Sequence, residues 1–114
     1  MLVDCHTHID QFCDWEVTEV LGRAALSDVQ VVVVAGTTLQ SSSRAVRLSA
    51  RFHQVFAGIG IHPMDLQGLL DREGYSQLDG LARSTDRVIA VSEIGLDFKE
   101  GMPDRAVQYQ AFRE

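Results

Sequence analysis

The sequence predicts an α/β fold built from four successive β/α units. Apolar runs typical of strands alternate with segments whose apolar residues recur at helical spacing, and each pair takes roughly thirty residues, the size of a βαβ unit. The second apolar run, Val29–Ala35, has valine at five of its seven positions. Such a continuous run is typical of a strand buried on both faces, which favours a parallel sheet.

The first two units occupy the N-terminal half of the sequence. The short apolar run Leu2–Cys5 predicts a buried strand, with the Cys5 thiol as a small buried hydrophobe. Glu16–Leu26 places its apolar residues at helical spacing and predicts a helix. Val29–Ala35 is the second strand, and Gln40–Phe52 again has the helical pattern.

The last two units follow the same order. Val55–Ile61 predicts the third strand, and a turn-rich segment from Gly68 to Gly74 leads to a helix over Tyr75–Ser84. Arg87–Glu93 predicts the fourth strand. Pro103 suits the first turn of a last helix, which runs through the remaining residues. Four β/α units are half of an eight-unit barrel, although they also fit an open doubly wound sheet.

Composition narrows the class of protein. The 114 residues are 46% apolar and 23% charged, ordinary values for a globular chain, and no linker divides them, so we expect one domain over residues 1–114. The net charge of −6 argues against a module that binds DNA by neutralising many phosphates. It does not exclude an enzyme that binds phosphate through metal cations.

Cysteine usage and the N-terminus indicate the compartment. Cys5 and Cys13 have neither zinc-finger spacing nor the number expected of a disulfide framework. The sequence starts with no signal-peptide pattern, and no apolar run is long enough to span a membrane. We therefore expect a cytoplasmic protein that has no membrane partner.

Polar residues at the predicted strand ends indicate a metal site. His6 and His8, in "DCHTHID", are two residues apart, so their side chains point the same way at the end of the first strand. His62 follows the third strand and Glu93 ends the fourth. In a parallel β/α architecture these ends meet at one edge, and imidazole and carboxylate suit divalent metals.

Each of these residues has an ordinary structural interpretation when taken alone. A lone His-x-His pair is more often not a ligand pair, His62 could be a hydrogen-bonded loop residue, and Glu93 a cap or salt-bridge partner. Together they favour a metal site, at which a glutamate such as Glu93 can bridge two ions. We expect His53, at a helix end, to lie on the surface, and Asp10 to brace a loop after the first strand.

Three motifs resemble those of the TatD family of metal-dependent deoxyribonucleases. They are "DCHTHID" at residues 4–10, "GIHP" at 60–63 and "SEIGLDF" at 92–98, in that order and spacing. Gln108 and Phe112 are similar to the family's Q-x-x-x-F. The resemblance covers the chain, as the N-terminal half of a member, and implies about the first four units of a TIM-type barrel.

The resemblance also implies a reaction. His6 and His8 would bind one divalent metal, and Glu93 would be the catalytic residue that bridges it to a second. His62 would contact the substrate phosphate. The full-length enzyme would use two ions of Mg, Mn or Zn and a metal-bound water to hydrolyse DNA phosphodiesters from the 3′ end.

Departures from the family pattern leave alternatives open. Ser92 stands where the family usually has glycine, and Met64 where many members have histidine. The family takes two further histidines and an aspartate from later strands, and this sequence contains no counterpart of them. The chain could therefore be a truncated or non-catalytic half-barrel that self-associates. An amidohydrolase acting on C–N bonds is a second alternative.

Overall fold

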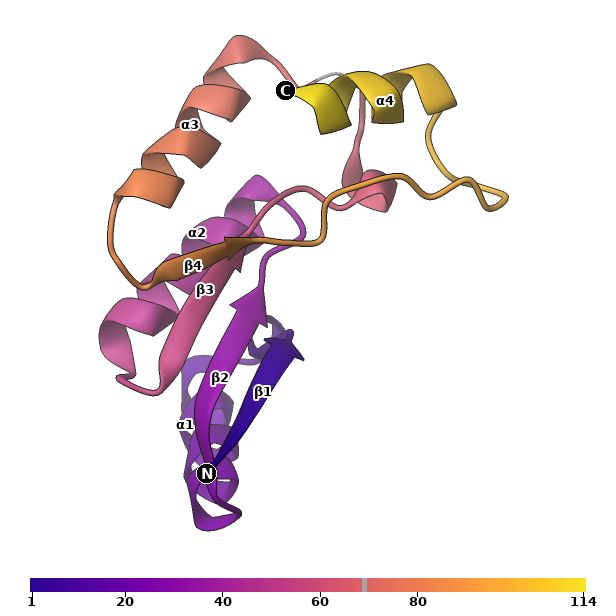
Figure 1. Cartoon of the computed structure of the whole chain (residues 1–114). Helices are drawn as coiled ribbons and strands as arrows, with labels where there is room; N and C mark the ends of the chain where they lie inside the picture. The colour runs from indigo at the N-terminus through magenta and orange to yellow at the C-terminus, as the bar shows by residue number, and fades with distance from the viewer. Residues whose placement is uncertain (69) are drawn as a thin grey trace.

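A computed structural model describes residues 1–68 and 70–114. Its core element is one parallel sheet with four strands in chain order: β1 (Leu2–Thr7), β2 (Val29–Ala35), β3 (Val55–Ile59) and β4 (Val88–Val91). The helices are α1 (Asp14–Leu26), α2 (Leu39–Arg51), α3 (Arg72–Arg83) and α4 (Arg105–Arg113), with short 3-10 turns η1 (Ile9–Gln11) and η2 (Pro63–Asp65). Strand and helix alternate as predicted, and α1 and α2 cover one side of the sheet (Figure 1).

The core lies between the two central strands and the first two helices. Val32 and Val34 of β2 alternate with residues that face the opposite side, and they pack on the helices together with Val55 and Ala57 of β3. The nine clustered residues are all nearly inaccessible to solvent: Ile9, Val17, Leu21, Val32, Val34, Ala45, Leu48, Val55 and Ala57. On the opposite side of β2, Val33 is buried as well, so the prediction of a two-sided buried strand is confirmed for the last four residues of β2.

The expectation of a buried first strand is wrong. β1 pairs only with β2 among the described strands, and five of its six residues are exposed, with Leu2 57% accessible. Cys5 is exposed too. The physical reason is position: an apolar run shows a preference for burial, but an edge strand is covered only by what packs beside it.

Element boundaries differ from the predicted ones by a few residues. β1 continues to Thr7, whereas β3 and β4 end at Ile59 and Val91. α3 begins earlier than predicted because the Asp71 side chain caps it, accepting a hydrogen bond of 2.8 Å from the Gly74 N–H. The predicted turn region is therefore shorter, and its residue 69 lies outside the described residues.

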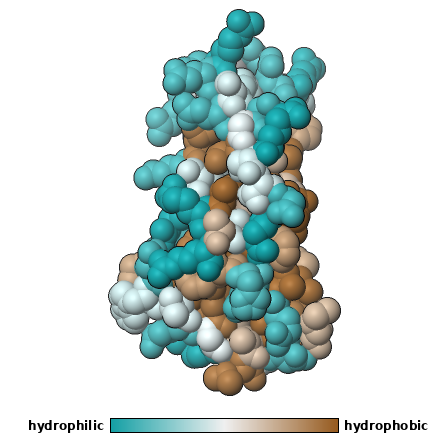
Figure 2. All heavy atoms as spheres, turned by 90° about the vertical axis from the view of Figure 1, so that its left-hand side faces the viewer, coloured by the Kyte–Doolittle hydropathy of each residue, from teal (hydrophilic) through white to brown (hydrophobic). Residues whose placement is uncertain are grey.

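Seen from the left of Figure 1, the surface mixes hydrophilic and hydrophobic residues (Figure 2). Within residues 1–68 and 70–114, none of the helices has the length and hydropathy needed to cross a membrane.

Candidate metal centre

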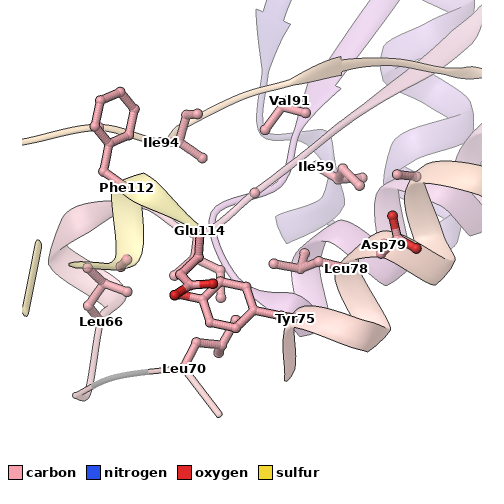
Figure 3. A pocket seen from close by; sticks show the side chains of 15 residues that line it. Ile59, Leu66, Leu70, Tyr75, Leu78, Asp79, Val91, Ile94, Phe112 and Glu114 are labelled. Atoms are coloured by element: carbon pink, nitrogen blue, oxygen red, sulfur yellow. The ribbon is translucent and has the colours of Figure 1, made fainter. Parts of the chain in front are cut away.

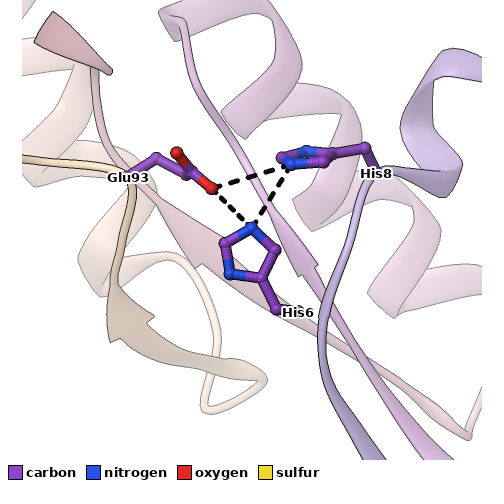
Figure 4. A group of neighbouring side chains, drawn as sticks. All are labelled: His6, His8 and Glu93. Carbon is purple, nitrogen blue, oxygen red and sulfur yellow. Dashed lines mark hydrogen bonds and ion pairs between the residues drawn. The ribbon is translucent and has the colours of Figure 1, made fainter.

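The centre is assembled from the two outermost strands of the sheet. His6 lies on β1, His8 follows it, and Glu93 lies two residues beyond β4. Adjacent strands lie about 4.8 Å apart, so a flat sheet would separate β1 from β4 by roughly 14 Å. One ligand atom of each of the three side chains nevertheless lies within 4.8 Å of the others (Figure 4). The sheet must therefore curve so that both strand ends aim at one point, as in a barrel.

The distances between ligand atoms resemble those around a single cation. His8 Nε2 lies 3.6 Å from Glu93 Oε1 and 3.3 Å from His6 Nε2. Ligand atoms held at about 2.1 Å from a tetrahedral metal lie roughly 3.4 Å apart, so these two spacings already fit. The third, from His6 Nε2 to Glu93 Oε1, is 2.5 Å. The His6 side chain is largely exposed.

A hydrogen bond at Nδ1 of His8 leaves its Nε2 unprotonated and directed at the centre. His8 Nδ1 lies 3.0 Å from the Ala35 carbonyl oxygen, which can only accept, so Nδ1 carries the proton. In the neutral ring Nε2 then offers its lone pair. An imidazole oriented through its other nitrogen is the usual arrangement for a metal-binding histidine. Two imidazole nitrogens and a carboxylate oxygen at these spacings form a donor set that fits a divalent metal.

The backbone at Glu93 adopts a conformation that L-residues avoid. Its φ is +59°, in the left-handed region. The segment before it is fixed by contact with β3: the Ser92 N–H donates to the Ile59 carbonyl at 2.9 Å. A Cβ at Gly60 would overlap the Ser92 carbonyl oxygen, so glycine there permits this close approach. Non-glycine residues in this region cluster at functional sites.

His62 faces the same carboxylate, but its hydrogen bond favours the opposite tautomer. Its Nδ1 accepts a hydrogen bond of 3.0 Å from the Met64 N–H. The proton of the neutral ring is therefore on Nε2, which lies 3.7 Å from Glu93 Oε2. His62 thus presents an N–H donor at the edge of the centre, whereas His8 presents a lone pair.

Comparison with known proteins places the sequence in a family. A family model described as TatD related DNase matches residues 3–114. The chain belongs to this family. It is 29% identical to the uncharacterized metal-dependent hydrolase YabD of Bacillus subtilis, covering 99% of this chain and 44% of YabD. It is 34% identical to the 3′-5′ ssDNA/RNA exonuclease TatD of Cronobacter turicensis, covering 89% of this chain and 38% of that protein.

A solved structure supports the same fold. The crystal structure of YjjV, a TatD homologue from Escherichia coli K12, superposes with a TM-score of 0.79 at 29% sequence identity. The superposition covers 98% of this chain and 44% of YjjV. The four β/α units therefore form a partial barrel of the TatD type, and the open doubly wound sheet is excluded. The chain spans less than half the length of these relatives.

The predictions from sequence did not include Arg44, which fixes the loop that follows His8. Its guanidinium donates to the carbonyls of Asp10 and Phe12 at 2.8 and 2.9 Å and to the Asp14 carboxylate. The hydrogen bond from Arg44, with that from Arg51, holds the pKa of Asp14 below its ordinary value. Burial raises the pKa of Asp10, whose Oδ1 has no hydrogen-bond partner among the described residues. A lone arginine on a helix gives no sequence signal for such a role.

Gln108 fixes the loop on the other side of the centre. Its buried amide accepts from the Asp97 N–H and donates to the carbonyls of Asp97 and Pro103, each at 2.8 Å. The Asp97 carboxylate is bound by Lys99, whose hydrogen bonds lower the pKa of Asp97. The Q-x-x-x-F pattern signalled the position of Gln108, though not this function.

A separate cavity of about 390 Å³ lies between α3, α4 and the ends of β3 and β4 (Figure 3). Its walls are mostly apolar, including Leu66, Leu70, Leu78 and Phe112. None of the four predicted site residues lines it. The cavity is therefore separate from the cluster of His6, His8 and Glu93.

Proposed function

We propose that the chain carries part of the active site of a divalent-metal-dependent phosphodiesterase that hydrolyses DNA from the 3′ end. The observation that carries the proposal is the convergence of His6, His8 and Glu93 at the carboxyl ends of the strands of a curved parallel sheet. Membership of the TatD related DNase family supports the class of reaction. The name of the Cronobacter relative, a 3′-5′ ssDNA/RNA exonuclease, supports the substrate class and the polarity.

Each residue has a distinct proposed role. His6, His8 and Glu93 would together hold one cation. Glu93 Oε2 points toward His62 and is available to a second cation, which would make this carboxylate a bridge. When bound, such cations polarise a phosphoryl oxygen and lower the pKa of a nearby water. Mg, Mn and Zn are all consistent with imidazole and carboxylate ligands.

His62 is proposed to bind the substrate phosphate. Its Nε2–H is a hydrogen-bond donor, and a phosphate oxygen is an acceptor. The Met64 N–H keeps the ring in that tautomer. Because the same interaction removes the lone pair from Nε2, His62 is better suited to the substrate than to a metal.

The chain carries only part of the proposed active site, because it covers only part of its relatives. The chain covers 38 to 44% of its relatives, which supports assigning residues 1–114 to the N-terminal half of such a barrel, as one domain. We expect residues 1–114 alone to be a weak nuclease.

The free thiols of Cys5 and Cys13 support a reducing compartment, the cytoplasm.

The metal content of residues 1–114 tests the proposal. Wild type should bind about one Mn²⁺ or Zn²⁺ per chain by elemental analysis, and His6→Ala/His8→Ala should bind none. His53→Ala is the matched control, because His53 is exposed and outside the ligand cluster. Metal retained in the double variant, or absent from wild type, would contradict the ligand assignment.

A non-catalytic half-barrel that self-associates is the second candidate. The observation that favours it is the exposure of apolar residues on β1 and β4, the two strands with one neighbour each among the described residues. Metal-dependent release of mononucleotides from the 3′ end of a labelled single strand separates the candidates, since a half-barrel without catalysis releases none. Loss of this release in Glu93→Gln assigns it to the centre.

A further inference from the structure

The side chain of Ser92, the residue before Glu93, lies directly over Gly58 of β3. A Cβ at position 58 would overlap Ser92 Oγ and would lie 3.1 Å from Ser92 Cβ. Nonbonded heavy atoms pack at about 3.5–4.0 Å, so no larger residue fits at position 58 while Ser92 stays in place. The Ser92 side chain therefore occupies the space that a side chain at position 58 would take.

The Ser92 hydroxyl gains no hydrogen bond in this place. Its Oγ is shielded from solvent and has no hydrogen-bond partner among the described residues. A buried hydroxyl without a partner is uncommon, because it loses its hydrogen bonds to water and gets none in exchange. What the Ser92 side chain does gain is its fit against Gly58, and this fit acts on the backbone that leads directly into Glu93.

The end of β3, on which Ser92 rests, is itself fixed by α2. Ser42 of α2 is fully buried, and its Oγ donates to the Gly60 carbonyl at 3.2 Å and accepts from the Gly60 N–H at 3.1 Å. From the other neighbour, the Ser92 N–H donates to the Ile59 carbonyl at 2.9 Å. The end of β3 is therefore bound from both sides, and it has little freedom to move away from Ser92.

We propose that Ser92 is a positioning residue, which fixes the Glu93 carboxylate by the fit of its own side chain over Gly58. The inference rests on the proposed function, because it takes Glu93 as a metal ligand. Glu93 has a φ of +59°, which a chain free to relax would leave. Holding Ser92 keeps Glu93 Oε1 at 3.6 Å from His8 Nε2 and Oε2 at 3.7 Å from His62 Nε2.

Calorimetric titration of residues 1–114 with Mn²⁺ tests the fit between the two positions. Gly58→Ala displaces the Ser92 side chain and should weaken Mn²⁺ binding about tenfold or more, as disturbing the orientation of a metal ligand does. Gly58→Ala/Ser92→Gly should bind as Ser92→Gly alone does, because the nearest neighbour left to the new Cβ is the Val34 carbonyl at 3.5 Å. Gly58→Ala/Ser92→Ala keeps the Cβ contact of 3.1 Å and should bind with intermediate affinity.

Gly80→Ala is the matched control. Gly80 lies within α3, and a Cβ there would meet nothing within 4 Å, so this variant should bind Mn²⁺ as wild type does. Circular dichroism checks that each titrated variant is folded. If the contact served the fold alone, Gly58→Ala would have a lower Tm but its folded chains would bind Mn²⁺ as wild type does, and this result would overturn the proposal. A double variant that binds no better than Gly58→Ala would overturn it too.

Failure of the proposed function would give a different result. A wild type that binds no Mn²⁺ would contradict the ligand assignment, and urea denaturation of the same variants would then judge the fit by itself. Gly58→Ala should unfold at a lower urea concentration than wild type, and Gly58→Ala/Ser92→Gly should regain the midpoint of Ser92→Gly. An effect of Gly58→Ala that is the same whichever residue stands at position 92 would refute the fit.

Discussion

At the scale of single residues, Glu93 shows a conflict between local conformation and chemistry. A carboxylate is held at φ +59°, where glycine would be free of strain. We predict that Glu93→Gly unfolds no more easily than wild type in the presence of a chelator, because relief of about 1 kcal/mol of strain offsets the lost contacts. The same variant should bind no metal at the centre. Urea denaturation and Mn²⁺ titration measure the two effects.

Glu93→Gln is the companion variant for that prediction. It keeps the strained backbone and the side-chain size but removes the charge, so it should weaken metal binding without a gain in stability. If Glu93→Gly were less stable than wild type by more than about 1 kcal/mol, the strained conformation would instead be maintained for the fold.

His62 and His8 should respond differently to the same substitution. Each ring is oriented by one hydrogen bond, but the Ala35 carbonyl leaves His8 a lone pair and the Met64 N–H leaves His62 a proton. We predict that His62→Ala binds Mn²⁺ as wild type does but loses affinity for a 3′-terminal mononucleotide. His8→Ala should lose the metal itself. Calorimetric titration with each ligand tests this, and metal loss in His62→Ala would contradict the assigned tautomer.

At the scale of elements, the approach of β4 to β3 depends on Gly60. A Cβ there would overlap the Ser92 backbone and lie 2.8 Å from Ile94 Cγ2. We predict that Gly60→Ala lowers the free energy of unfolding by at least about 2 kcal/mol, since backbone cannot give way as a flexible side chain does. It should also weaken metal binding, because Glu93 follows the displaced residue.

Gly22→Ala is the matched control for Gly60→Ala. Gly22 lies within α1, and a Cβ there would meet nothing within 4 Å. Alanine in place of a helical glycine should raise stability by about 0.5–1 kcal/mol. A similar loss in both variants would show that Gly60 has no special contact.

Arg44 connects α2 to the loop that carries the chain away from His8. We predict that Arg44→Ala lowers the free energy of unfolding by about 1–3 kcal/mol, because it leaves the Asp10 and Phe12 carbonyls and the Asp14 carboxylate without this donor. Arg47→Ala, on the same helix, removes only an exposed bond to Ser43 and should change stability by less than about 0.5 kcal/mol. Urea denaturation of both variants compares them.

The elements themselves were largely predictable, because hydrophobic period and turn residues act locally. The four strands and four helices appear in the predicted order. The ends of β3 and β4 were not predictable, because the strand-like runs extend past them to Gly60 and Glu93. Only the contact between neighbouring strands shows where pairing stops. The early start of α3 depends on one side-chain cap at Asp71, a signal that the turn-rich sequence around it obscured.

At the scale of the whole molecule, sequence could predict which side chains meet but not what covers the edges. Parallel strands imply that His6, His8 and Glu93 share one end of the sheet, and the structure places them there. Burial of β1 was expected from its composition and is not found, because composition cannot indicate which strand lacks a neighbour. The curvature that brings β1 to β4 is likewise a property of the complete sheet.

That curvature makes the metal a connection between the first and last strands. A ligand that binds only the folded chain stabilises it by about 2.7 kcal/mol at one hundred times its dissociation constant. For a domain of this size we predict that saturating Mn²⁺ or Zn²⁺ raises the Tm by roughly 10 °C, and that a chelator reverses the shift. Differential scanning calorimetry measures it.

Which strands the metal stabilises is a sharper test than the size of the Tm shift. Because His6 and Glu93 lie on opposite edges, metal should slow amide hydrogen exchange in β1 and β4 more than in the already buried β2 and β3. The His6→Ala/His8→Ala variant should show neither the Tm shift nor the added protection. Protection confined to β1 would mean that the histidines bind the cation without Glu93, and that the two edges of the sheet are not joined through the centre.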